Sequence, residues 1–282
     1  MLFLPINKTL LCTGLFLATI FLAVPRAKAQ SSDYLNIQAL LDDVQKKHQY
    51  VSLKLYGYTF TLRRIEQQLD NKGRVKKETV KVFQVFPVHH AMPVMVLLSE
   101  NGKNLSSARL ADEKARANNE WRKRKKASRK VAGQKEQGEM LSFFQTSEFS
   151  MSRTEKYKDR DIIVLSFKPR DNLKPSTDSE KFVSKLEGEV WVDALEKSVV
   201  KVDARLAENY KVGGVLSFFS FLKPGTSLVI ENSRLSDELW VTTSVKFAPL
   251  QKVSFFAKGV PDVQIQELSE YKPFDKEADS LY

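Results

Sequence analysis

The sequence predicts a mainly β protein of the α+β class, in which a curved antiparallel sheet carries an N-terminal helix and an inserted basic helix against one face. Most of the chain consists of short segments in which apolar and polar residues alternate, with Gly, Asn or Pro between one segment and the next. One long segment, from Ser106 to about Gln137, is instead rich in Ala, Lys, Arg and Glu, which favours a helix. No internal repeat of fixed period is evident.

The first thirty residues have the features of a secretory signal peptide. A lysine precedes an apolar run from Leu10 to Val24, and the small residues Ala27 and Ala29 provide the A-x-A pattern of a signal peptidase site. The run of about fifteen residues is shorter than the roughly twenty that span a membrane. We therefore expect cleavage between Ala29 and Gln30, export to the periplasm, and a single domain formed by residues 30–282.

Cys12 is the only cysteine and lies inside this apolar run, far from Ala29. Because a lipid anchor requires its cysteine at the cleavage point, we expect no lipid anchor. The mature protein is then expected to have neither a disulfide nor a thiolate metal site. No other segment approaches eighteen uninterrupted apolar residues, which predicts a soluble mature protein.

The first half of the mature chain is expected to form a helix, a long hairpin and a further strand. An apolar stripe at helical spacing predicts a helix over Asp33–His48. Alternating residues then predict strands over Tyr50–Leu69 and Arg74–Phe86, joined by the turn Asp70–Gly73. Val94–Leu98 predicts the strand that leads into the basic helix.

The second half is expected to be a series of strands in which each pairs with the next. About ten strands in meander order imply one curved antiparallel sheet. The predicted strands of this half are Phe143–Met151, Asp161–Lys168, Gly188–Asp193, Val200–Leu206, Val212–Leu222, Ser227–Arg234, Glu238–Phe247, Lys252–Lys258 and Val263–Ser269.

The positive charge of the mature chain is concentrated in the predicted basic helix. Arg109 to Lys130 contains ten basic and three acidic residues. Three interpretations are open: a nucleic-acid patch, contact with anionic lipid headgroups, or a solvated helix face. Export argues against nucleic acid, and an indole beside the cations favours lipid. The candidates for contact with headgroups, or for a movable lid, are Trp121, Arg122, Lys123, Arg124, Lys125 and Lys126.

Large aromatic residues are frequent in the predicted strands of the second half. Phe218-Phe219 and Phe255-Phe256 each place aromatic side chains on both faces of a strand, which a sheet with one wet face would avoid. Either both faces are covered by an ordinary core, or one face lines an apolar cavity. The candidate cavity residues are Trp191, Phe218, Phe221, Trp240, Phe247 and Phe255.

The sequence offers little from which to build an active site. The only histidines are His48, His89 and His90, and the adjacent pair points to opposite sides of an extended chain, without Cys or an acidic cluster to complete a ligand set. No nucleophile elbow, H-E-x-x-H motif or phosphate-binding glycine loop is present. We therefore expect no catalytic residues, no metal, no cofactor and no enzymatic activity.

Two motifs carry a resemblance to a known family. A strand that ends in Leu97–Ser106 precedes the charged helix, and Gly188–Asp193 reads Gly-Glu-Val-Trp-Val-Asp before its return strand. With the preceding helix and hairpin, this order resembles exported bacterial proteins of the LolA/LolB-like lipoprotein-carrier superfamily, especially its longer members. The resemblance implies a half-open β barrel with helices at its mouth, an apolar cavity for acyl chains, and no catalytic residue.

These observations favour a monomeric, non-enzymatic periplasmic binding or carrier protein for a lipid or an acylated, lipoprotein-like ligand, with transient contact to an anionic membrane surface and none to nucleic acid. One alternative is an envelope protein-interaction or sensor module that uses the same half-barrel as a protein-binding surface. A further alternative is an envelope hydrolase that depends on His89 or His90.

Overall fold

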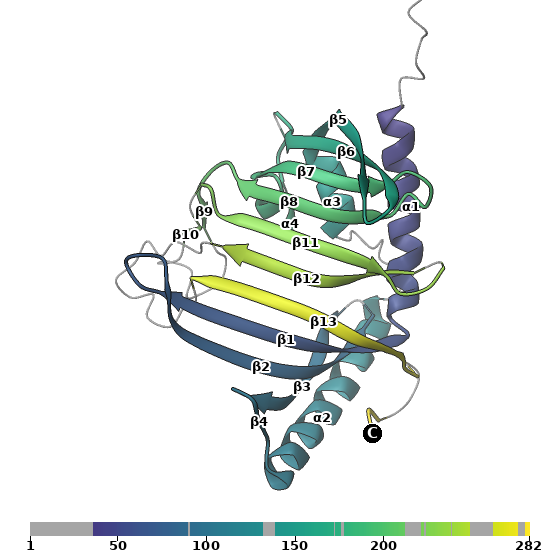
Figure 1. Cartoon of the computed structure of the whole chain (residues 1–282). Coiled ribbons are helices and arrows are strands. Elements are labelled where there is room, and N and C mark those ends of the chain that lie inside the picture. The colour runs from purple at the N-terminus through teal and green to yellow at the C-terminus, as the bar shows by residue number, and fades with distance from the viewer. Residues whose placement is uncertain are drawn as a thin grey trace, which may run out of the picture. The chain divides into compact units, whose positions relative to one another are not determined.

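Among the described residues, eleven strands form one antiparallel sheet, and four helices accompany it (Figure 1). The computed structural model describes residues 36–89, 91–131, 139–171, 173–175, 178–211, 221–222, 224–237, 239–248, 262–275 and 280–282. All of them belong to the unit Asn36–Tyr282. The expected signal peptide and its cleavage site, Ala29 and Gln30, lie outside the described residues.

The strands of the large sheet are β1 (Tyr58–Leu69), β2 (Val75–Val88), β3 (Ala91–Glu100), β4 (Lys103–Asn104), β5 (Ser147–Tyr157), β6 (Arg160–Pro169), β7 (Leu186–Asp193), β8 (Val199–Leu206), β11 (Ser227–Arg234), β12 (Trp240–Ala248) and β13 (Val263–Pro273). A separate pair is formed by β9 (Tyr210–Lys211) and β10 (Phe221–Leu222). The helices are α1 (Ile37–Leu55), α2 (Ser107–Val131), α3 (Glu139–Thr146) and α4 (Asp178–Val183).

The order of the strands confirms the antiparallel sheet and corrects the simple meander. The order is β4-β3-β2-β1-β13-β12-β11-β8-β7-β6-β5, and the edge strands β4 and β5 do not pair with each other, so the described sheet is not closed into a barrel. The last strand, β13, pairs with β1 on one side and β12 on the other. The meander is therefore divided into two, because α2 and α3 carry the chain from one edge of the sheet to the other.

The N-terminal helix is longer than the sequence pattern indicated. Asn36 caps α1 by accepting a hydrogen bond from the Ala39 backbone N–H at 3.1 Å, and the helix continues to Leu55. The start of the predicted strand at Tyr50 was wrong. Val51 is buried in the same helical stripe as Leu40 and Val44, so the period of 3.6 continues through the segment in which an alternation of two was read.

The predicted strand Phe143–Met151 also begins later than expected. Phe143 and Phe144 belong to α3, and β5 starts at Ser147. The ring of Phe143 lies 4.7 Å from that of Phe167 in β6 and 5.2 Å from that of Phe149 in β5. This aromatic packing holds α3 against the sheet.

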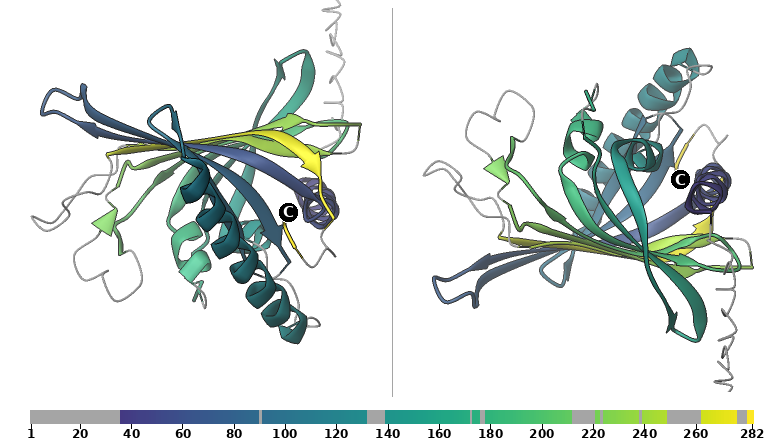
Figure 2. Two further views of the ribbon diagram at one scale, coloured as in Figure 1. Left: turned by 90° about the horizontal axis from the view of Figure 1, so that it is seen from below. Right: turned by 90° about the horizontal axis from the view of Figure 1, so that it is seen from above.

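The register of the strands defines two faces of the sheet, because residues directly opposite one another in an antiparallel pair point to the same side. The face that contains Phe167, and hence contacts α3, is called the α3 face. Alternate residues, among them Trp191, form the other side, called the Trp191 face. Figure 2 shows α1, α3 and α4 on one side of the sheet, while the β5–β6 hairpin bends toward the other.

The basic helix α2 confirms, over residues 107–131, the helix predicted for Ser106 to about Gln137. It lies along the part of β3 before Ser99, which among the described residues has no strand beyond it because β4 pairs only with Ser99 and Glu100. Ala117 and Trp121 pack on Phe86, Val94 and Val96, and Trp121 is only 2% exposed. Its charged residues also satisfy the edge of β3. Arg116 donates to the Met95 carbonyl, Arg124 donates to the carbonyls of Met92 and Pro93, and the Leu97 N–H donates to Glu113. The unpaired edge is thus covered by side chains rather than by another strand.

Candidate ligand surface

A set of apolar side chains from neighbouring strands shares the α3 face and is called here the apolar strip. Register connects Leu62 in β1 with Phe83 in β2 and Leu97 in β3, and with Leu268 in β13. The same face can be followed across the rest of the sheet through residues that lie opposite one another on neighbouring strands: Gln266, Val245, Ile230, Val202 and Val190. These residues therefore share the face of the residues under α3. The apolar strip consists of Phe60, Leu62, Phe83, Val85, Met95, Leu97, Ile230, Val245, Phe247 and Leu268.

The α3 face is closed at one end and partly open along the strip. Beneath α3, Leu165 and Val190 are fully buried. Within the strip only Leu62 and Val85 are buried, at 6% and 2% exposure, and the other eight members are half-buried. Large apolar side chains that stay half-buried on a sheet are a candidate surface for an apolar ligand.

Arg64 lies at the polar end of this strip. It is directly opposite Gln266, two residues along β1 from Leu62, and therefore on the α3 face. Its guanidinium lies over the ring of Phe83, 5.2 Å from the centroid, and its Nη2 is 3.9 Å from the sulfur of Met95. Its Nε is buried and has no hydrogen-bond partner among the described residues.

Trp191 and Trp240, both predicted to line a cavity, lie instead in a filled cluster. They pack with Ile162, Val164 and Val200 and are 7% and 8% exposed. Each indole N–H is used: Trp191 donates to Glu155 at 2.8 Å, and Trp240 donates to Glu196 at 2.5 Å. These two residues therefore form a second core rather than the wall of an empty apolar cavity.

Ion pairs cover this second core. Arg153 contacts Glu155 and Glu189, both at 2.6 Å, and Lys201 lies 4.5 Å from the centroid of the Trp191 ring. The hydrogen bond from Trp191, followed by that from Arg153, holds the pKa of Glu155 below its ordinary value. Among the described residues these charges are paired with one another, so the cluster is satisfied without a ligand.

A second paired cluster surrounds Asp193, whose side chain is 1% exposed. It accepts from Arg160 and from the backbone N–H groups of Leu195 and Glu196 at 3.0 and 2.7 Å. Burial by itself raises the pKa of Asp193, but these hydrogen bonds outweigh it, and the pKa lies below its ordinary value.

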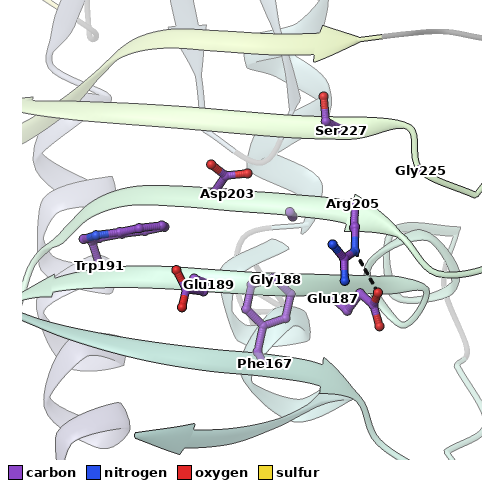
Figure 3. A pocket seen from close by; sticks show the side chains of 10 residues that line it. Phe167, Glu187, Gly188, Glu189, Trp191, Asp203, Arg205, Gly225 and Ser227 are labelled. Carbon is purple, nitrogen blue, oxygen red and sulfur yellow. Dashed lines mark hydrogen bonds and ion pairs between the residues drawn. The ribbon is translucent and has the colours of Figure 1, made fainter. Parts of the chain in front are cut away.

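A polar groove of about 530 Å³ lies over β7, β8 and the start of β11 (Figure 3). Glu187 and Arg205 form an ion pair at 2.9 Å within it, and Glu189 and Asp203 lie opposite each other on neighbouring strands. Four of its ten lining residues are charged, and Phe167 and Trp191 also lie in its wall. An acyl chain there would remove these charges from water, so the groove does not suit one.

The other predicted cavity residues are divided between the strip and undescribed parts of the chain. Phe247 lies in β12 on the α3 face and is half-buried, so it belongs to the apolar strip. Phe218 and Phe255 lie outside the described residues, and the side chain of Phe221 is not described either.

The predicted headgroup residues of α2 have different environments. Trp121 packs edge-to-face with Phe274, 5.3 Å between ring centroids, and its burial corrects the expectation that the indole meets lipid. Arg124 and Lys125 are half-buried, and Arg124 pairs with Glu120 at 3.0 Å. Arg122, Lys123 and Lys126 are exposed and remain candidates.

The described histidines have packing roles. His48 lies on α1, 3.2 Å from the hydroxyl of Ser52, and burial lowers its pKa. His89 packs edge-to-face with Tyr56 at 4.5 Å. His90 is not described. Within the described ranges, no group of three or more His, Cys, Asp or Glu is placed to hold a metal ion.

No helix in the described part of the chain is both long and apolar enough to cross a membrane.

The apolar strip and Arg64 were not predicted from the sequence, although it contains a signal for them. Phe60, Leu62 and Arg64 alternate with Thr61 and Arg63, so a strand must place one of the two adjacent arginines on the apolar side. The large aromatic residues from which a cavity was predicted lie in later strands.

The described residues form an open antiparallel sheet accompanied by helices, which is the architecture of a half-open β barrel. No family model and no curated protein matches the sequence.

Solved structures provide the similarities. The chain is similar to a putative outer membrane lipoprotein-sorting protein domain from Vibrio parahaemolyticus, with 10% identity, 84% of this chain and 93% of that chain covered, and a TM-score of 0.40. It is also similar to a LolA superfamily protein from Nitrosomonas europaea, with 12% identity, coverage of 84% and 93%, and a TM-score of 0.36. For a DUF1329 family protein from Desulfovibrio piger, the identity is 9%, the coverage 86% and 95%, and the TM-score 0.33.

Proposed function

We propose that this protein is a non-enzymatic binding or carrier protein of the cell envelope, which holds a lipid or an acylated polypeptide against the apolar strip. The observation that carries the proposal is the contrast along the α3 face, fully buried beneath α3 and half-buried along the strip. Covering that surface with an acyl chain would stabilise the complex by roughly 25 cal/mol for each Å² of apolar surface removed from water.

In this proposal the mature protein is the single domain formed by residues 30–282, released as a monomer into the periplasm. The exposed cations Arg122, Lys123 and Lys126 of α2 then approach anionic headgroups, each contributing about 1 kcal/mol near such a surface. The buried side of α2 stays fixed to β3, so the helix presents these cations from the sheet edge.

The test combines native mass spectrometry of gently purified protein with uptake of a fluorescent fatty acid. Wild type is expected to carry lipid and to take up the probe. Phe83→Ser, on the strip, should weaken uptake at least fivefold. Val82→Ser is the matched control, since this neighbouring half-buried residue of β2 points to the opposite face. Wild type without lipid or uptake, or equal effects of the two variants, would overturn the proposal.

A second candidate function, partner binding by strand addition, is favoured by the edge strand β5. It pairs only with β6 within the described sheet, and Ser150 to Thr154 are exposed. A peptide could extend the sheet there through backbone hydrogen bonds. Thr154→Pro would then abolish crosslinking to an envelope protein while fatty-acid uptake persists; unchanged crosslinking would rule this candidate out.

A further inference from the structure

Arg64 is a cation at the end of the apolar strip, where Lys81 and Gln266 lie opposite it on the neighbouring strands. Leu62 precedes it by two residues on the same face, and its guanidinium lies against Phe83 and Met95. In the described part of the chain neither contact neutralises its charge, and its Nε is buried without a hydrogen-bond partner. A half-buried guanidinium is costly unless an anion or acceptor completes its donor set.

We propose that Arg64 binds the carboxylate of a single-chain amphiphile whose apolar tail lies along the apolar strip. This inference rests on the proposed function and specifies the chemical class of its ligand, a fatty-acid-like monoanion. A planar guanidinium can donate two parallel hydrogen bonds to a carboxylate, which fixes the head of the ligand while burial holds the tail.

The arrangement along the strands matches the two ends of such a ligand. Toward the start of β1, the α3 face carries Phe60 and Leu62, with Val85 and Phe83 opposite them on β2. Beyond Arg64 the same face becomes polar, with Glu66 on β1 and Gln264 on β13. On β1 and β13, Arg64 therefore marks the change from apolar to polar residues, whereas β12 stays apolar at Phe247, opposite Gln264.

The local charge favours a monoanion. Lys81, directly opposite Arg64, is engaged by Glu100 at 3.4 Å, so among the described residues beside the apolar strip the guanidinium of Arg64 is the positive charge available to a ligand. Glu66, two residues along the same face, would repel additional negative charge. A carboxylate balances Arg64, whereas a phosphomonoester dianion would leave an excess of negative charge at a half-buried position.

The experiment measures binding of oleate and of the uncharged oleyl alcohol to the purified full-length protein at pH 8, below the micellar range. For Arg64→Gln we expect oleate binding to weaken about tenfold or more, since a charged hydrogen bond is lost, and alcohol binding to change less than twofold. Arg64→Lys keeps the charge without the planar donor pair, so it should recover part of the affinity.

Arg63→Gln is the matched control. Arg63 is the adjacent residue of β1, points to the opposite face, and pairs with Glu267 at 2.6 Å, so its loss removes the same charge without touching the strip. It should leave oleate binding within twofold of wild type.

The outcomes separate this inference from the proposed function. If wild type binds oleate and the alcohol equally and Arg64→Gln changes neither, the inference fails while apolar binding stands. If Arg64→Gln weakens binding of lysophosphatidylglycerol but not of oleate, the carboxylate assignment is wrong. If neither oleate nor the alcohol binds, both proposals fail together.

Discussion

Gly188 occupies a position on β7 that no other residue can take without displacing the neighbouring strand. A Cβ there would lie 2.0 Å from the carbonyl oxygen of Asp203 and 2.9 Å from the Cα of Ala204, both backbone atoms of β8. The Gly-x-Val-Trp-Val-Asp motif therefore begins with a residue selected for close approach of two strands.

We predict that Gly188→Ala lowers the free energy of unfolding by about 3 kcal/mol or more, because β7 must move away from β8. Gly73→Ala is the control: this turn glycine has φ +76° but nothing within 4 Å, so its cost should be about 1 kcal/mol, from backbone conformation alone. Urea unfolding followed by circular dichroism measures both. Equal losses would contradict a clash at Gly188.

Asp193 predicts how stability depends on pH. Its pKa is lowered in the folded protein, so its contribution is complete above its unfolded pKa of about 4 and is lost as pH falls through the folded value. Asp193→Asn should cost about 1–3 kcal/mol at pH 7, and the difference from wild type should shrink progressively below pH 4. Unfolding free energies measured between pH 7 and pH 2 test this; a difference independent of pH would contradict it.

At the residue scale, the sequence predicts which strand residues alternate between the two faces better than it predicts what surrounds each side chain. The alternation predicted for Val200–Leu206 is confirmed for Val202, Ala204 and Leu206, which are buried on the α3 face, whereas Val200, beside a register shift, packs with Trp191 on the other face. The roles of Trp191 and Trp240 were not predicted, because an indole in a strand is equally consistent with a cavity wall and with a sealed core. Only the partners Glu155 and Glu196, distant in sequence, distinguish the two.

At the element scale, α2 was predicted by composition, but its attachment was not. Few apolar residues lie on it, so its composition predicts a helix with little apolar contact to the rest of the protein. The structure shows Trp121 and Ala117 buried and arginines bound to the edge carbonyls of β3. The unpaired backbone carbonyls of a strand edge can bind cationic side chains, and no local sequence pattern reveals such a contact.

The two sides of α2 should therefore respond differently to substitution. Trp121→Ala is expected to lower the free energy of unfolding by about 3–5 kcal/mol, as for other buried aromatic residues.

The double variant Lys123→Gln/Lys126→Gln should leave stability within about 0.5 kcal/mol but weaken binding to anionic vesicles. Chemical denaturation and vesicle sedimentation measure these effects. Lys76→Gln/Lys77→Gln, which removes two exposed cations from β2, is the control. Equal loss of vesicle binding in the two double variants would contradict a specific role of α2.

At the scale of the whole molecule, the antiparallel sheet was predicted but the position of its last strand was not. Hairpin pairing follows from local turns, such as the one at Asn101 and Gly102, both with positive φ. The pairing of β13 with β1 joins segments about two hundred residues apart, so no local turn specifies it. It is favoured by contacts such as the burial of Leu62 and Ile65 and the ion pair of Arg63 with Glu267.

This long-range pairing predicts that the sheet unfolds as one cooperative unit. β13 is the only strand of the described sheet that connects β1–β4 with β5–β12. Gln266 pairs with Arg64 on one side and Val245 on the other. Gln266→Pro removes a ladder donor and introduces a ring at this central position, so we expect a loss of about 3 kcal/mol or more and a lowered Tm for both halves together. Thr154→Pro, in the edge strand β5, should lower the free energy of unfolding by less, because one side of that strand is unpaired.

Hydrogen exchange resolved by peptide distinguishes the cases. Loss of protection in both halves for Gln266→Pro confirms the coupling, and loss confined to β1–β3 would show that the two meanders fold independently.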